Sequence, residues 1–375
     1  MGDAAPRIRA AIAARGPITF AEFMAEALVG PEGYFAVPPV GPDGDFLTAP
    51  HVHPVFADLV RFALDDLRRA LGAPDPFRVV ELGAGDGTLL DAVRAGFRDI
   101  DGIAVDVAAV EASPGAREAL ARRGITAVAA LDDLPPTDPT VVVANELLDN
   151  LPFRWLRRTE DAFVEIRVAA EGDRFVEVEA PCEPDLAALA GDVPVGGDAF
   201  VSPAALALVD ALAAWLGRGA VLLVDYGWAD RPAGEAHGFR DHRPTDDVLA
   251  EPGRRDITAG VDFGAITRRA RERWLVVLGE ARQEDVLRAL GYADWQRAQR
   301  ERQADRDAAG DAIAALHIWE GRRLAAMLVD PTRMGDFRWL LLATPGVPAP
   351  TWIGARGAAD SPDAPSEGRT AERPA

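Results

Sequence analysis

The stretch Glu81-Leu82-Gly83-Ala84-Gly85-Asp86-Gly87-Thr88 decides the fold of this chain. It follows an apolar run, residues 77–80, that is typical of a buried strand. It precedes a second apolar run, residues 89–93, that is typical of the start of a helix. A glycine turn lets the backbone approach a ligand closely, and a helix start offers free N–H groups to a negative group. The stretch therefore predicts a cofactor-binding corner.

The spacing of the glycines distinguishes between two classes of cofactor. A dinucleotide-binding turn reads G-x-G-x-x-G, and its third glycine would fall at Thr88. Here the third glycine is Gly87, and Glu81 lies two positions before Gly83. This E-x-G-x-G-x-G form resembles motif I of the class I methyltransferases, which bind S-adenosylmethionine (SAM). Glu111 ends the next predicted strand, 28 residues after Gly83, and is a candidate to hold two ribose hydroxyls.

The composition of the chain indicates which class of partner it binds and in which cellular compartment it is expected. The chain has 375 residues, 49% of them hydrophobic, and a formal net charge of −20. Such a surface disfavours nucleic acid and acidic membranes and favours a basic protein or peptide. Cys182 is the only cysteine, so no internal disulfide can form and a cytoplasmic location is expected. No apolar run reaches the roughly 18 residues that span a bilayer, so we expect no membrane insertion.

The order of the predicted elements indicates an α/β fold. Strands are expected near residues 77–82, 104–111, 125–130, 140–145 and 219–225, with helices between the early ones. This alternation predicts the doubly wound, Rossmann-like sheet of a class I methyltransferase. Residues 153–180 alternate with a period of two around Glu171-Gly172-Asp173, which predicts an inserted antiparallel hairpin. Residues 265–330 are expected to be mostly helical, with a final strand near 337–343.

These expectations divide the chain into six parts. They are an N-terminal helical segment and lid loop (1–76), the first part of the cofactor-binding core (77–152), the inserted antiparallel region (153–202), the second part of the core (203–264), a C-terminal helical and strand region (265–353) and a disordered tail (354–375). In the first part, two short helices are expected to meet at Gly16-Pro17, and Thr19 with Glu22 resembles a capping box.

Two further segments carry chemistry. Residues 44–50 form a polar loop that could close over the cofactor, which makes Thr48 a candidate cofactor contact and Asp45 a weaker candidate catalytic acid. In residues 141–153, polar side chains follow three buried valines, and ligands bind at such strand ends in doubly wound sheets. Asn145 is a further candidate cofactor contact, and Glu146 and Asp149 are the candidate catalytic acids that would hold a cationic methyl acceptor.

His237 and His242 do not make a convincing metal site. Their five-residue spacing suits no single helical face, and no cysteine or third histidine is nearby. We therefore expect no bound metal.

With these segments in hand, the chain resembles the MidA-type SAM-dependent methyltransferases. The resemblance rests on residues 18–24, 44–50, 81–88, 110–114, 144–152, 224–227 and 256–263 and spans roughly residues 15–345. It implies SAM as the cofactor, held by Glu81, Gly83, Gly85, Gly87, Glu111, Asn145 and Thr48. The family includes a mitochondrial assembly factor of complex I that methylates an arginine. The resemblance therefore implies that the substrate is a protein, such as a respiratory-complex subunit.

The chain departs from the family after the lid loop. Relatives usually read P-E-I-S-Q-x-F-G-E, whereas His51 replaces the first acid here and Asp58 replaces the second. Three hypotheses follow: a protein methyltransferase, a SAM-binding assembly factor or chaperone that has lost catalysis, and an NAD(P) oxidoreductase. Thr88 and the lack of any lysine argue against the third.

Overall fold

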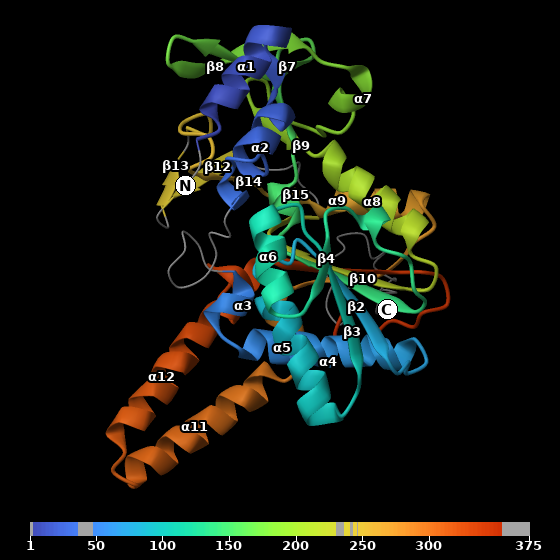
Figure 1. Ribbon diagram of the computed structural model, residues 1–375, viewed down its shortest axis with the longest axis vertical. Helices are drawn as coiled ribbons and strands as arrows, with labels where there is room; N and C mark the ends of the chain where they lie inside the picture. The colour runs from blue at the N-terminus through green and yellow to red at the C-terminus, as the bar shows by residue number, and fades with distance from the viewer. Residues whose placement is uncertain (1–2, 37–47, 230–235, 241–242, 246, 355–375) are drawn as a thin grey trace, which may run out of the picture.

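The computed structural model describes residues 3–36, 48–229, 236–240, 243–245 and 247–354. A large central sheet with its helices forms the body, a smaller lobe of strands and N-terminal helices lies at one end, and a helical arm projects from the other (Figure 1). Asp45, His242 and the predicted tail beyond residue 354 lie outside the described residues. No helix within the described ranges is long and apolar enough to cross a membrane.

The central sheet has seven strands in the order β16-β17-β10-β5-β2-β3-β4. Their bounds are β2 Phe77–Leu82, β3 Val105–Val110, β4 Thr126–Val128, β5 Thr140–Asn145, β10 Gly219–Asp225, β16 Val276–Arg282 and β17 Arg338–Ala343. Strands β2, β3, β4, β5 and β10 run parallel to one another. β17 pairs antiparallel with β10, and β16 pairs antiparallel with β17 at the edge of the sheet. The predicted doubly wound fold is confirmed.

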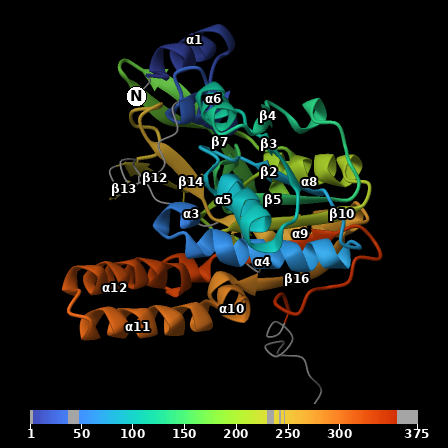
Figure 2. The same cartoon turned by 60° about the horizontal axis from the view of Figure 1, so that its bottom comes forward.

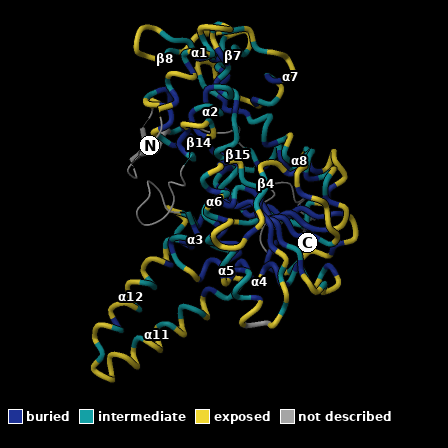
Figure 3. The backbone as a smooth tube through the Cα atoms, viewed as in Figure 1, coloured by how far each residue is buried: buried dark blue, intermediate teal, exposed yellow. Residues whose placement is uncertain are grey.

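Helices cover both faces of this sheet because its strands are apolar on both sides (Figure 2). On one face, Val79 and Val141 pack with α4 (Val55–Ala70) and α5 (Thr88–Gly96). On the other, Val80 packs with α8 (Pro203–Trp215) and α9 (Phe263–Glu272). Strand side chains alternate between faces, so continuous apolar runs such as residues 141–144 build both layers. Figure 3 shows the resulting buried centre.

The second lobe is an antiparallel sheet rather than an isolated hairpin. The predicted hairpin strands, β7 (Phe163–Glu171) and β8 (Arg174–Pro181), pair as expected. Three further strands extend them in the order β1-β7-β6-β9, with bounds β1 Ile18–Thr19, β6 Arg154–Arg158 and β9 Asp198–Val201. Extra strands are needed because a lone two-stranded hairpin is marginally stable in water.

The N-terminal helices pack on this lobe (Figure 1). As predicted, α1 (Ala5–Arg15) and α2 (Phe20–Leu28) flank Gly16-Pro17, and Thr19 and Glu22 form the capping box of α2. Phe20 lies in the centre of an aromatic cluster, with its ring centroid 5.3 Å from that of Phe153 and 5.5 Å from that of Trp155.

The remaining elements include small strand pairs and short helices. They are α3 (Ala49–Val52), α6 (Pro114–Arg122), α7 (Pro184–Ala187), α10 (Gln283–Ala289), α11 (Tyr292–Ala308), α12 (Ala312–Ala326), β11 (Gly227–Trp228), β12 (Ala236–Arg240), β13 (Arg243–Thr245), β14 (Asp256–Ala259), β15 (Val261–Asp262), η1 (Tyr34–Ala36), a π-helical turn η2 (Phe97–Asp101), η3 (Leu131–Asp133), η4 (Leu148–Asn150), η5 (Met327–Val329) and η6 (Met334–Asp336).

Residues 265–330 are mostly helical, as expected, but one segment of this region is a strand. Residues 276–282 form β16, an edge strand that pairs with β17 through a register shift between Val277 and Gly279. Within the described part of the chain, no strand pairs with the outer edge of β16, and the strand is only partly buried. Its sequence therefore lacks a clean apolar alternation. The final strand, β17, is confirmed.

Candidate active site

The candidate site lies where the parallel strands end together. The carboxyl ends of β2, β3 and β5 lead into Gly83, Glu111 and Glu146, and these residues line one cavity of about 320 Å³. Parallel strands place such ends at one edge of the sheet, which is where ligands bind in doubly wound folds. The geometry therefore brings together three motifs that are distant in the sequence.

The glycine turn requires its glycines for two separate reasons. Gly83, Gly85 and Gly87 all have positive φ, of 67°, 54° and 80°, a region that other residues rarely adopt. A Cβ atom at Gly83 would also lie 2.7 Å from Leu147 Cδ1, whereas one at Gly85 would meet nothing within 4 Å. Gly85 lines the cavity, so a side chain at this position would take up space that a ligand in the cavity could occupy.

Glu111 supports the turn and lines the cavity. Its Oε2 accepts a hydrogen bond from Gly85 N at 3.0 Å, and its Oε1 accepts one from Ser113 N at 2.8 Å. Burial raises the pKa of Glu111, although these hydrogen bonds oppose the shift. A ligand that donates two hydroxyl hydrogen bonds would compensate for the burial of this carboxylate.

Replacing Glu111 by Ala should weaken SAM binding by roughly 1–3 kcal/mol, or about 5–150-fold, because a charged hydrogen-bond partner is lost. Isothermal titration calorimetry on folded protein measures this effect. Glu118→Ala, which removes an exposed glutamate from the neighbouring helix α6, is the matched control and should bind SAM like wild type. Equal affinities in the two variants would exclude Glu111 as a cofactor contact.

Glu81 and Asn145 present unpartnered polar atoms to the same cavity. Among the described residues, Glu81 Oε2 and Asn145 Oδ1 are buried without a hydrogen-bond partner. Burial, together with the charges of Asp86 and Glu111, raises the pKa of Glu81 well above its ordinary value. Buried polar groups without partners are costly, so both atoms indicate a polar ligand.

His51 lies between Thr48 and Asp86 of the glycine turn. Thr48 Oγ1 lies 2.7 Å from His51 Nδ1, and His51 Nε2 lies 3.4 Å from Asp86 Oδ1. Burial would raise the pKa of Asp86, but His51 and hydrogen bonds from Thr88 lower it below its ordinary range. His51, on α3, therefore lies beside the glycine turn, although its Nε2 makes no hydrogen bond to a described residue. The role of Asp86 was missed because it requires His51 as a partner.

Glu146 occupies a constrained position after β5. Its φ is 52°, a left-handed conformation that is uncommon for a non-glycine residue and clusters at functional sites. Glu146 Oε1 accepts hydrogen bonds from Ala49 N at 2.8 Å and from Asn145 Nδ2 at 3.0 Å. Burial and the nearby charge of Asp149 raise the pKa of Glu146 to about 7.

Asp149 is close to Glu146 but does not line the cofactor cavity. Its Oδ2 accepts a 2.7 Å hydrogen bond from Thr258 Oγ1 on β14, and its Oδ1 has no hydrogen-bond partner in the described part of the chain. Burial raises the pKa of Asp149. The two predicted catalytic acids therefore lie together, but they face different surroundings.

A third buried acid, Asp225, completes an acidic cluster that the search for single motifs missed. Asp225 ends β10, is fully buried, and accepts hydrogen bonds from Leu148 N at 2.8 Å and Tyr226 N at 2.8 Å. Burial raises its pKa well above the ordinary value, and the charges of Asp149 and Glu146 add to the shift. The sequence does contain an indication of Asp225: a polar residue at the end of a buried strand, as at Asn145.

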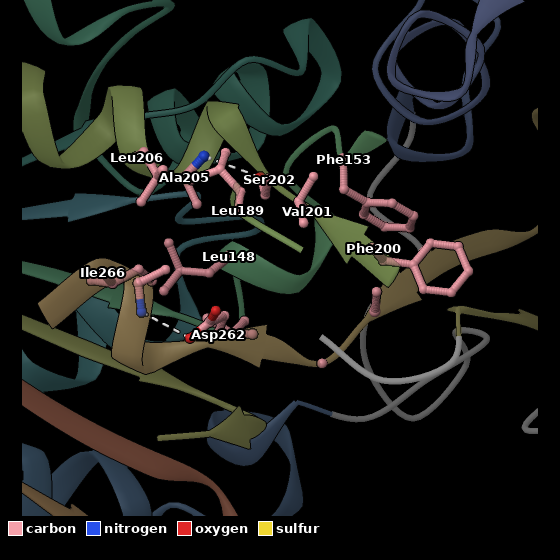
Figure 4. A pocket seen from close by; sticks show the side chains of 14 residues that line it. Leu148, Phe153, Leu189, Phe200, Val201, Ser202, Ala205, Leu206, Asp262 and Ile266 are labelled. Atoms are coloured by element: carbon pink, nitrogen blue, oxygen red, sulfur yellow. Dashed lines mark hydrogen bonds between the residues drawn. The ribbon is translucent and has the colours of Figure 1, made fainter. Parts of the chain in front are cut away.

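A smaller pocket of about 40 Å³ lies behind η4, between α8 and α9 (Figure 4). Apolar side chains such as Leu148 and Ile266 form most of its wall. Its two polar side chains cap helices, since Ser202 Oγ accepts from Ala205 N and Asp262 Oδ1 accepts from Ala265 N. This pocket offers no free polar group for chemistry. No cluster of three metal-ligating side chains occurs among the residues that the structure describes.

The fold and the site together define a SAM-binding methyltransferase. Residues 63–280 match the model of a family of S-adenosyl-L-methionine-dependent methyltransferases, and the chain belongs to that family. Its orphaned Glu81 and Asn145 atoms, the open space at Gly85 and the carboxylate of Glu111 fit this cofactor.

Similar proteins agree with this assignment. The chain is 29% identical to protein arginine methyltransferase NDUFAF7, mitochondrial, of Xenopus tropicalis, over 75% of this chain and 73% of that protein. It is 28% identical to the Homo sapiens protein of the same name, over 75% and 71%. A crystal structure from Burkholderia thailandensis, bound to S-adenosyl-homocysteine, matches with a TM-score of 0.82 and 28% identity over 94% of this chain and 95% of that one.

Proposed function

We propose that this methyltransferase transfers a methyl group to an arginine side chain of a protein. The observation that carries the proposal is the acidic cluster of Glu146, Asp149 and Asp225 beside the cofactor cavity. Three buried carboxyls with raised pKa values need a cation to become charged together. A guanidinium group is always protonated and binds carboxylates through paired N–H groups. The arginine methyltransferases among the similar proteins support this choice.

The residues of the site have two roles, cofactor binding and acceptor binding. The cofactor is held by the glycine turn together with Glu81, Glu111, Asn145 and Thr48. It supplies a methyl group on a sulfonium that is already a good leaving group. Glu146 lines the cavity and accepts hydrogen bonds through Oε1. It can hold the acceptor guanidinium and direct one nitrogen toward the methyl group. Asp149 and Asp225 lie behind it, and with a bound cation these carboxyls can ionise and add negative charge.

The surface of the chain favours a basic protein partner. The net charge of −20 would attract an arginine-rich segment and accelerate its association at low salt. A respiratory-complex subunit, which the family resemblance implies, is the first acceptor to test. We also propose a cytoplasmic location, which fractionation of the native cells would check.

The direct test uses SAM with an isotopically labelled methyl group, purified enzyme, and protein extract from cells that lack its gene. Mass spectrometry should find the label on arginine, and Glu146→Gln enzyme should label the same extract about 100-fold more slowly. Label on another side chain would overturn the arginine proposal. Intact SAM binding without any labelled protein would instead support the alternative of a SAM-binding assembly factor.

Acceptor affinity should rise with pH. The folded-state pKa of Glu146 is about 7, above its ordinary value, so this group is mostly protonated at pH 6 and mostly ionised at pH 8. An arginine peptide should therefore bind roughly tenfold more tightly at pH 8 than at pH 6. Calorimetry in the presence of S-adenosyl-homocysteine measures this change. Glu146→Gln should flatten the profile, and a flat profile in wild type would contradict the assignment.

A further inference from the structure

The helical arm is a rigid extension of the body. Its helices α11 and α12 run antiparallel and project away from the central sheet in both views (Figures 1 and 2). Arg322 joins them, because its Nε donates to Gln296 Oε1 at 3.1 Å and its Nη1 donates to Gln303 Oε1 at 2.7 Å. At the base, the ring of Trp295 lies 5.0 Å from that of His53. These contacts fix α11 and α12 relative to each other and to the body of the protein.

An apolar face of α12 is exposed on this arm. Ile313 is 71% exposed, Leu316 51%, Trp319 46% and Leu324 42%. Ten large hydrophobic side chains are exposed within the described chain, and four of them lie on this one helix. Figure 3 shows the outer part of the arm as largely exposed. Contiguous apolar patches of this kind mark interaction surfaces, whereas single exposed apolar residues need no explanation.

The charge of the arm indicates which partner fits. Residues 292–326 contain six arginines and six acidic residues, whereas the whole chain carries a net charge of −20. A basic partner would be attracted to the acidic body rather than to this neutral face. A second copy of the chain can meet the arm without bringing two acidic surfaces together, because the two bodies lie at opposite ends of antiparallel arms.

Two charged residues within the face are complementary to each other. Glu320 and Arg323 are exposed on α12, and neither has an ion-pair partner among the described residues. In a two-fold, antiparallel pairing, residue i of one copy meets residue j of the other, and j meets i. Glu320 of each copy can therefore lie opposite Arg323 of the other. Arg323 also covers Trp319, with its guanidinium carbon 5.7 Å from the ring centroid. Trp and Arg are enriched in interface centres.

We propose that the exposed face of α12 pairs with the same face of a second copy, so that two arms form a four-helix bundle and the protein is a homodimer. With Glu320 opposite Arg323, residues 317–326 of the two α12 helices overlap, which gives about 15 Å of helix-to-helix contact, or nearly three turns. The paired hairpins match the packing of helical bundles. This inference concerns assembly and does not depend on the methyl acceptor.

The first test is the mass of the full-length protein in solution. Sedimentation velocity should show a dimer for wild type, and Leu316→Glu/Trp319→Glu should weaken association by at least about 100-fold, since two buried apolar contacts become charged. Trp274→Glu is the control: Trp274 is 85% exposed but lies outside the arm, so this variant should remain dimeric. Circular dichroism confirms folding. A monomeric wild type, or an unaffected double variant, would overturn the proposal.

A charge-reversal experiment tests the two-fold arrangement. Glu320→Arg alone should place like charges opposite each other and weaken the dimer, and Arg323→Glu alone should do the same. Mixing these two single variants should restore association as a heterodimer, because each then offers the complement of the other. Native mass spectrometry with one variant isotopically labelled identifies the mixed species. Failure of the mixture to associate more tightly than either variant alone would overturn the antiparallel pairing.

Discussion

Gly85→Val should abolish SAM binding while leaving the fold intact. The valine side chain would enter the open space at the cavity wall, where a Cβ atom meets no protein atom within 4 Å. Because the protein itself does not occupy that space, the added methyl groups would clash with the cofactor rather than with the core. We expect affinity to fall at least about 100-fold, since close approach of the backbone is what the glycine provides.

The backbone strain of this substitution has a matched control. Gly85 has a φ of +54°, and a branched residue there costs of order 1–3 kcal/mol. Gly124 has a φ of +66°, also has open space at its Cβ position, and does not line the cavity. Gly124→Val should therefore lose similar stability but retain SAM affinity. Calorimetry and thermal melts separate the two effects. Wild-type SAM affinity in folded Gly85→Val would refute the cofactor site.

Glu146→Gln should lower turnover on an arginine acceptor by about 100-fold and change SAM affinity less than about threefold. Removing one preorganised electrostatic group from an active site typically costs this much in rate. The amide keeps an oxygen that can accept from Ala49 N and Asn145 Nδ2, so the local geometry should persist. The negative charge that holds a guanidinium is lost. Single-turnover kinetics with a labelled methyl donor measure the effect.

Two other variants place limits on this interpretation. Asp149→Asn should reduce turnover less, because Asp149 does not line the cofactor cavity. Asp58→Asn removes an exposed acid on α4 outside the cavity and should turn over like wild type. If Glu146→Gln abolishes SAM binding with the fold intact, Glu146 is a cofactor ligand rather than an acceptor ligand. If it has full activity, the acceptor is held elsewhere.

The cofactor corner could be predicted because its determinants are local. The turn from β2 into α5 depends on three glycines within five residues, and all three have positive φ. Buried parallel strands appear in the sequence as apolar runs, and the polar residues that follow them mark one edge of the sheet. Glu111 and Glu146 were identified in this way, and both line the cavity.

The acidic cluster could be predicted only in part. Asp149 and Asp225 are 76 residues apart, and they meet because β10 pairs directly with β5 in the sheet. Thr258, which donates to Asp149, comes from a further strand, 109 residues along the chain. No local pattern encodes such contacts, because strand order depends on how the whole chain packs. The meaning of His51 likewise depends on Asp86 across the site.

The sequence by itself determined the fold class, the cofactor turn and the candidate acids at the strand ends, because periodicity, glycine conformation and strand polarity are local properties. Only the tertiary structure decided that Asp149 faces Thr258 rather than the cofactor cavity, that the inserted hairpin joins a larger sheet, and that α12 exposes an apolar face. The physical reason is the same in each case: the partner of a side chain or strand edge is supplied by segments distant in sequence, and burial is a property of the packed chain.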